Sequence, residues 1–203
     1  MTIIRLNDLE RIVEVERAAF IPPLQASPEK ITKRLSLGHV YLGLETDNKL
    51  VGTLAFKFSD FEIPRTFYEF SDGPSKGNAV FIYSLGILPE YRGRNTLELI
   101  DSALKFSGMS GMQYSVADGR MPSYNGSLEF HQERILQDPE FKKIIDGHIT
   151  RGTTPSIEET KLDPNLAFLV RFVHGKPLKL IPNFMPEDKP SGGHRIILCK
   201  ELK

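Results

Sequence analysis

Residues 81–104 read FIYSLGILPEYRGRNTLELIDSAL, and the order of features in this stretch decides the fold. The apolar run 81–88 predicts a buried central strand, which ends at Pro89. A short loop with the sequence Arg-Gly-Arg follows at 92–94, and a helix is expected from about Asn95. The first amides of a helix have no partner inside it, and the helix dipole places partial positive charge there. The stretch therefore predicts an anion site that suits a phosphate or a pyrophosphate.

The composition of the whole chain is that of an ordinary globular protein. It has 203 residues, of which 40% are hydrophobic and 26% are charged, so it can bury a sizeable core. The formal net charge of +0 argues against the broad basic face that nucleic-acid binding requires. Cys199 is the only cysteine, which excludes an internal disulfide and a Cys-rich zinc site.

The apolar runs of the sequence are too short to cross a bilayer. The N-terminal sequence MTIIRLNDLERIVEVE becomes acidic too early for a secretory signal. We therefore expect a cytoplasmic protein that does not bind membranes.

The patterns along the chain predict a single domain over residues 1–203. Two strand patterns, 40–45 and 50–58, flank Thr-Asp-Asn-Lys and indicate a hairpin. The stretch 61–78 is expected to be a long loop. Ser27-Pro28 predicts a helix cap followed by proline at the first helical position, and Asp163-Pro164 predicts the cap of a later helix. The full predicted order is a strand, two helices, three strands, a helix, a fifth strand, a helical insert within 122–163, a further helix and two last strands.

Residues 89–94 resemble the start of the acyl-CoA loop of the GNAT acetyltransferases, whose pattern is Pro-x-x-Arg-Gly-x-Gly-x-Gly/Ala. Asn95 stands where the family usually has glycine, and Leu97 stands where it has glycine or alanine. The resemblance implies an α/β, GNAT-like fold. Such a fold is a splayed, mixed β-sheet of about seven strands flanked by helices, here with a helical insert after the fifth strand.

Three further segments resemble a subset of larger GNAT proteins that carry a Gly-Arg-x-Pro-x-Tyr loop. Residues 118–124 read DGRMPSY, which is similar to Gly-Gly-Arg-Ile-Pro-Gly-Tyr. Residues 163–168 read DPNLAF and match the subset's Asp-Pro-x-Leu-x-Phe pattern, and residues 181–184 read IPNF beside its Ile-Pro-Asn-Tyr. Because all three occur in the right order, the resemblance covers nearly the whole chain.

The resemblance implies an N-acetyltransferase that moves an acetyl group from acetyl-CoA to an amine of a small molecule or protein by direct attack. The thioester would lie where the fourth strand and the stretch 112–117 diverge. No metal is implied, and the assembly stays open between a monomer and a homodimer. Residues expected at the cofactor through main-chain groups or charge are Leu85, Gly86, Ile87, Arg92, Gly93, Arg94, Asn95, Thr96 and Leu97.

The catalytic residues are harder to predict. Many GNAT enzymes place a tyrosine on the late helix to protonate the departing thiolate, but here that position is Leu169. Other candidates are Tyr124 after the fifth strand, Tyr83 on the central strand and His174 at the end of the late helix, each of which also has a purely structural interpretation.

A second hypothesis is therefore a non-catalytic GNAT-like module that binds an acyl-CoA or another ligand. Leu169, Leu97 and Glu98 motivate it, since a carboxylate in the first helical turn repels a phosphate. The remaining histidines show no paired metal-ligand spacing, and we expect most of them to be solvated or satisfied locally: His39, His131, His148 and His194.

Overall fold

The chain forms two compact units, and each is described by itself. The computed structural model describes residues 2–60, 73–109, 111–120, 122–125, 136–151, 153, 155–163, 166, 179–184 and 194–201. The first unit comprises Met1–Ser115 with Leu202–Lys203, and the second comprises Val116–Glu201. The single domain expected from the sequence stays a prediction.

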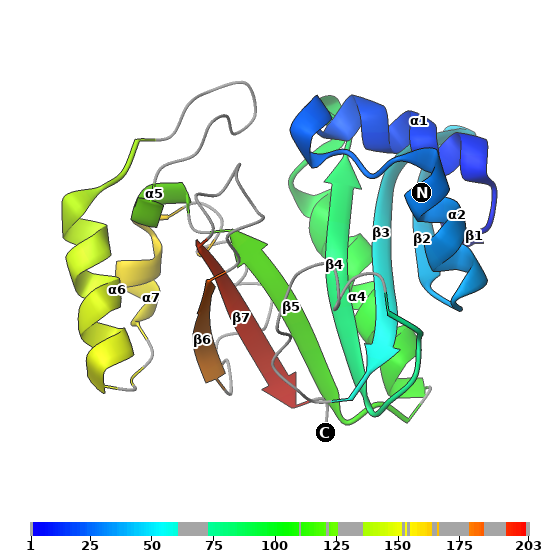
Figure 1. Cartoon of the computed structure of the whole chain (residues 1–203). Coiled ribbons are helices and arrows are strands. Elements are labelled where there is room, and N and C mark those ends of the chain that lie inside the picture. Colours follow the sequence, from blue (N-terminus) through cyan, green and yellow to red (C-terminus); the bar gives the residue numbers. More distant parts are fainter. Residues whose placement is uncertain are drawn as a thin grey trace. The chain divides into compact units, whose positions relative to one another are not determined.

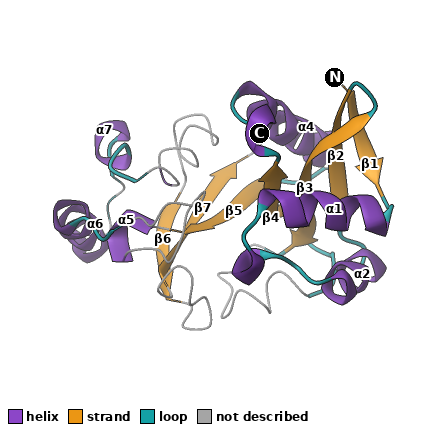
Figure 2. Cartoon of the chain, turned by 90° about the horizontal axis from the view of Figure 1, so that it is seen from above, coloured by secondary structure: helices purple, strands orange, loops and turns teal. Residues whose placement is uncertain are grey.

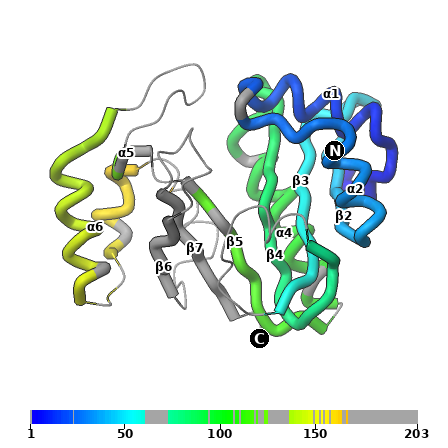
Figure 3. The backbone as a smooth tube through the Cα atoms, in the orientation of Figure 1, coloured from blue at the N-terminus to red at the C-terminus, as the bar shows by residue number. Residues whose placement is uncertain are grey.

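The first unit is a sheet covered by helices on both faces. Its strands β1, β2, β3 and β4 lie side by side in this order, each antiparallel to its neighbour (Figures 1 and 3). Figure 2 shows α1 and α2 on one face of the sheet and α4 on the other. The elements are β1 (Thr2–Leu6), α1 (Leu9–Ala19), η1 (Pro22–Leu24), α2 (Pro28–Ser36), β2 (Val40–Thr46), β3 (Lys49–Ser59), β4 (Ala79–Ile87), η2 (Pro89–Tyr91) and α4 (Arg94–Met109).

Local sequence signals explain where several of these elements begin and turn. The Ser27 side chain accepts a hydrogen bond from the Lys30 amide and caps α2, which starts with proline as predicted. The predicted hairpin forms between β2 and β3, and both residues of its turn, Asp47 and Asn48, have positive φ angles of 52° and 62°. A two-residue turn of this conformation matches the twist of the flanking strands.

The core of this unit lies on both sides of the sheet. On one side α1 and α2 bury Ile12 and Ile31, and on the other α4 buries Leu99 and Ile100. The amide of Gln113 donates to the carbonyl of Asn78 (2.8 Å), so the chain that leaves α4 returns beside the start of β4. A helical crossover is the connection that parallel strands require, and it makes this a mixed α/β fold.

The second unit contains the predicted helical insert. After β5 (Tyr114–Arg120), whose first two residues belong to the first unit, come α5 (Pro122–Asn125), α6 (Pro139–Arg151) and α7 (Ile157–Thr160). Two last strands follow, β6 (Lys179–Phe184) and β7 (His194–Glu201), which pair antiparallel; β7 lies between β5 and β6 (Figure 1).

Among the described residues, the α/β class, the seven strands and the insert after the fifth strand agree with the prediction. Asp163 accepts a hydrogen bond from the Leu166 amide (2.8 Å), as the predicted cap of the late helix would, although residues 167–178 lie outside the described part. The predicted splay between β4 and β5 spans the two units and stays a prediction. In the part of the chain that the structure describes, no helix is long and apolar enough to cross a membrane.

Candidate functional site

The loop between β4 and α4 is held by short-range hydrogen bonds. Nε of Arg92 donates to the carbonyl of Ile87 (3.2 Å), which ties the loop to the end of the strand. Nδ2 of Asn95 donates to the carbonyl of Tyr91 (2.8 Å). The asparagine that replaces the family's usual glycine therefore has a local structural role. Burial lowers the pKa of Arg92 against the opposing effect of Glu90.

Gly93 leaves the backbone of this loop open. Its φ of +96° lies in a region that favours glycine, and a Cβ atom there would have no atom within 4 Å beyond Gly93 and its two chain neighbours. The loop runs directly into α4 (Arg94–Met109), where the first amides of a helix have no partner within it; of these, the Thr96 amide donates to the carbonyl of Gly93 (3.0 Å). These features fit a ligand whose phosphate oxygens approach the main chain closely. Leu97, in the first turn, is 45% exposed, and Thr96 is buried.

Strand β4 carries a bulge immediately before the residues predicted to contact the cofactor. Phe56 of β3 pairs with Ile82 and Ala55 pairs with Ser84, so Tyr83 is an extra residue in β4. Bulges are frequent next to active sites because they re-aim neighbouring groups. Here the bulge separates the buried start of β4 from the segment Leu85–Ile87.

Tyr83 belongs to a buried polar cluster in the first unit. Its hydroxyl lies 2.8 Å from Nδ1 of His39, whose Nε2 lies 2.7 Å from the carbonyl oxygen of Gly73. The guanidinium of Arg34 lies 4.6 Å from the centre of the Tyr83 ring. Against the larger effect of burial, which raises the pKa of Tyr41, the nearby polar groups of Arg34 and Tyr83 lower it. The side chains of all four residues are buried, so they depend on one another for polar partners.

Glu16 of α1 adds a carboxylate to this cluster. It is 5% exposed, and its side chain accepts a hydrogen bond from the Ala26 amide (2.8 Å) in the connection to α2. Burial raises the pKa of Glu16, while the Ala26 bond and the charge of Arg34 act in the opposite direction. Burial also raises the pKa of Tyr41, which keeps its hydroxyl protonated.

Sequence reasoning singled out Tyr83 but missed its buried partners. His39 is an exception to the expectation that most histidines are solvated or satisfied locally: it is 2% exposed and bonds a residue 44 positions away. The helical pattern of the sequence could have indicated two other residues of the cluster. Glu16 falls on the buried face of α1 with Ile12, and Arg34 falls on that of α2 with Ile31.

Tyr124 lies in a second, separate cluster in the second unit. Its hydroxyl donates to Oδ1 of Asp146 (2.5 Å), and Nζ of Lys142 donates to the Tyr124 oxygen (3.3 Å) and to Oδ2 of Asp146 (2.7 Å). Burial and then the bond to Asp146 raise the pKa of Tyr124, against the effect of Lys142. A raised pKa makes the hydroxyl a weaker proton donor.

The remaining predicted residues are placed as follows. His174 and Leu169 lie outside the described residues, and for Arg94 only the backbone is described. Tyr83 and the cofactor-binding stretch share the first unit, whereas Tyr124 is in the second. Among the described residues, no group of three or more His, Cys, Asp and Glu side chains could hold a metal ion.

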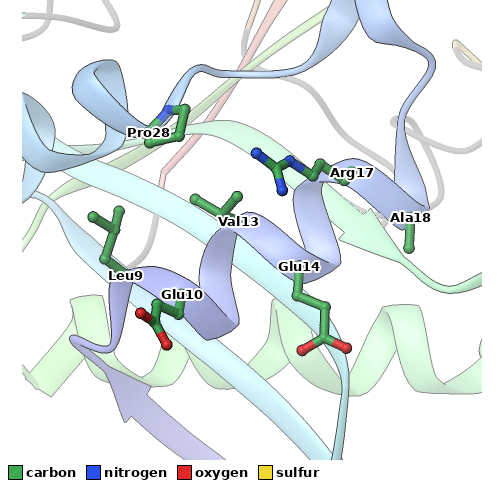
Figure 4. Close-up of a pocket in the computed structure, with 7 residues that line it drawn as sticks. All are labelled: Leu9, Glu10, Val13, Glu14, Arg17, Ala18 and Pro28. Atoms are coloured by element: carbon green, nitrogen blue, oxygen red, sulfur yellow. The ribbon is translucent and has the colours of Figure 1, made fainter.

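A depression of about 560 Å³ lies along α1 in the first unit (Figure 4). Figure 4 shows Glu10 and Glu14 pointing to one side of the helix, while Val13 points toward Pro28 at the start of α2. The lining contains none of the residues predicted for the cofactor or for catalysis. The depression therefore has no part in the candidate site.

Comparison with known proteins identifies the family. The family model described as "Acetyltransferase (GNAT) family" matches residues 9–134, which include β4, the Gly93 loop and α4. The chain belongs to the GNAT acetyltransferase family. No curated protein matches this GNAT chain by sequence.

Solved structures share the fold of this GNAT protein over its full length. The loading GNATL domain of CurA from Lyngbya majuscula is 20% identical, with 99% of this chain and 97% of that chain covered and a TM-score of 0.69. The GphF GNAT-like decarboxylase in complex with isobutyryl-CoA is 19% identical, with both chains fully covered and a TM-score of 0.68. An aminoglycoside 6'-N-acetyltransferase complexed with coenzyme A is 11% identical, with 100% and 98% covered and a TM-score of 0.60.

Proposed function

We propose that the protein is an acyl-CoA-dependent acyltransferase that transfers an acetyl group to an amine of a small molecule or protein. Membership of the GNAT family carries this proposal, and the open backbone at Gly93 supports it. The acyl-CoA would bind through main-chain groups of Leu85–Ile87 and of the loop 92–97. Its pyrophosphate would lie at the start of α4, where the helix dipole favours negative charge.

In the proposed reaction the amine nitrogen attacks the thioester carbonyl directly. The C–N bond forms, the tetrahedral intermediate collapses, and the C–S bond breaks to give an amide and the thiolate of CoA. The nitrogen loses a proton and the thiolate gains one. The proposed proton-transfer residues are still Tyr124, Tyr83 and His174. Burial and then the hydrogen bond to Asp146 raise the pKa of Tyr124, which makes its hydroxyl a weaker proton donor.

Thermal unfolding with acetyl-CoA and with free CoA tests the proposal. A ligand at about 100 times its Kd stabilises the folded state by roughly 2.7 kcal/mol. We expect a clear rise in Tm with both ligands, followed by thiol release when a suitable amine is added to acetyl-CoA. If neither ligand raises the Tm, the protein does not bind CoA and the proposed enzyme activity is wrong.

A second candidate is decarboxylation of a carboxyacyl-CoA, and one observation favours it. The neighbour described as a GNAT-like decarboxylase has a TM-score of 0.68, whereas the aminoglycoside acetyltransferase reaches 0.60. With malonyl-CoA as the probe, the bond to the carboxylate would break, CO₂ would leave, and the remaining carbanion would take a proton to give acetyl-CoA. Release of CO₂ without any amine would favour this candidate over N-acetylation.

The same assays distinguish a non-catalytic module. Such a module would show a Tm shift with CoA, but neither thiol release across an amine panel nor CO₂ release from malonyl-CoA. The exposed Leu97 in the first turn of α4 motivates this alternative, because the family usually has a small residue there.

A further inference from the structure

The bulge at Tyr83 sets the register of the strand segment that is proposed to hold the cofactor. Beyond the bulge, Leu85 pairs with Leu54 and Gly86 pairs with Thr53. Side chains alternate between the faces of a sheet, so if the bulge were lost and Tyr83 paired with Ala55, every later residue of β4 would move by one place. Leu85 would then stand opposite Thr53, where Gly86 now stands.

A side chain at that position would force its neighbours in α1 to shift. A Cβ atom at Gly86 would lie 2.8 Å from Cε2 of Phe20 and 3.1 Å from Cβ of Ala19, at the end of α1. A leucine there would collide with the helix. The bulge therefore decides which residue faces α1, and with it the direction in which the backbone groups of Leu85–Ile87 point.

Two hydrogen bonds hold the bulged residue Tyr83, and both donate in the same direction, from Tyr83 to His39 and from His39 to Gly73. The carbonyl oxygen of Gly73 can only accept, so Nε2 of His39 carries the proton of that 2.7 Å contact. In the neutral ring Nδ1 is then an acceptor, and the Tyr83 hydroxyl donates to it over 2.8 Å. This tautomer follows from the chemistry of the partners.

Arg34 packs against the same tyrosine: its guanidinium lies 4.6 Å from the centre of the Tyr83 ring. The order of donation is thus Tyr83, His39 and finally Gly73.

We propose that His39 is a positioning residue of the acyl-CoA site: it accepts the Tyr83 hydrogen bond, fixes the bulge and thereby sets the register of Leu85–Ile87. This inference rests on the proposed function, because it assigns His39 a role toward the cofactor. In this role His39 acts on the cofactor site through Tyr83 and not as a ligand of the cofactor.

Two substitutions separate the two ring nitrogens of His39. In His39→Asn the side-chain oxygen takes the place of Nδ1 and still accepts from Tyr83, but the bond to Gly73 is lost. In His39→Gln the side-chain amide takes the place of Nε2 and still donates to Gly73, but the acceptor for Tyr83 is lost. Each variant gives up one buried hydrogen bond, so a purely structural role predicts similar behaviour for both.

The experiment is calorimetric titration of the wild type and of each variant with CoA, together with urea unfolding. We expect His39→Gln and Tyr83→Phe to weaken CoA binding about tenfold, which corresponds to the loss of one net hydrogen bond, and His39→Asn to stay within about twofold of the wild type. Amide exchange at residues 84–87 should rise in His39→Gln and stay at the wild-type rate in His39→Asn.

Equal CoA affinity in the Asn and Gln variants, or equal exchange at 84–87, would overturn the inference while leaving the proposed function intact. A wild-type protein that binds no CoA would instead overturn the proposed function and the cofactor role of His39 together. Amide exchange would then still judge whether His39 fixes the register.

Discussion

Gly86 of β4 and Phe20 at the end of α1 are packed so closely that any side chain at position 86 would displace the Phe20 ring or the helix. The ring carbon Cε2 of Phe20 would lie 2.8 Å from a Cβ atom at Gly86. The helix therefore rests on bare backbone of the strand that is proposed to bind acyl-CoA. A change at this contact alters both the packing of α1 and the cofactor strand.

We expect Gly86→Ala to lower the free energy of unfolding by about 1–3 kcal/mol, because the added methyl forces the Phe20 ring or the helix to shift. Urea unfolding measures the loss. Gly108→Ala is the control, since it lies within α4 with no atom within 4 Å of its Cβ position and should stabilise by about 0.5–1 kcal/mol. If Gly86→Ala is as stable as the wild type, the close contact is not present in solution.

The loop before α4 offers a test that separates backbone strain from ligand binding. Gly93 and Gly111 both have positive φ, +96° and +76°, with open space around the Cβ position. Alanine at either site should therefore cost about 1–2 kcal/mol of stability for the same reason. Only Gly93→Ala should also weaken CoA binding in a calorimetric titration. Equal CoA affinity in the two variants would place the pyrophosphate elsewhere.

Tyr124 can be tested through the carboxylate that holds its hydroxyl. Tyr124→Phe should cost about 1 kcal/mol of stability through the lost hydrogen bond to Asp146. If the hydroxyl is the proton donor, kcat should also fall while KM stays unchanged.

Asp146→Asn sharpens this test of Tyr124. The carboxylate contributes to the raised pKa of Tyr124, so its removal lowers that pKa and moves the alkaline limb of the kcat profile to lower pH. If the alkaline limb of the kcat profile does not move in Asp146→Asn, Tyr124 is not the acid and has a structural role only.

Glu16 makes a contribution to the free energy of unfolding that decreases as the pH rises. Its pKa in the folded protein is raised above the ordinary value of 4.5, chiefly by burial, so the folded state holds this proton more tightly than the unfolded state. The stabilisation from this proton is complete below pH 4.5 and is lost as the pH rises through the raised pKa.

Glu16→Gln isolates that contribution because glutamine still accepts the Ala26 hydrogen bond but does not titrate. The unfolding free energy of the wild type, relative to Glu16→Gln, should fall as the pH rises from about 4.5. The same substitution at the exposed Glu14 controls for removing one charge from α1. A wild-type advantage that grows with pH would contradict the assignment.

The elements that the sequence predicted well depend on signals within a few residues. The Ser27-Pro28 start of α2 and the two-residue turn at Asp47 and Asn48 each act on neighbouring backbone groups, so their effect is local. The order of strands and helices around Gly93 follows from the same kind of signal, and the family match over 9–134 agrees with it. Helices α5 and α7, of four residues each, are too short for a periodic pattern and were not predicted.

The sequence by itself determined the α/β fold class, the GNAT family and the loop between β4 and α4, because capping, turn and periodicity signals are local and survive substitution elsewhere. Only the tertiary structure decided that Tyr83 is a bulged residue, that Gly86 meets Phe20 and that His39 reaches Gly73. Each of these relationships joins residues far apart along the chain, and burial makes each polar group depend on a partner that only the packed fold can supply.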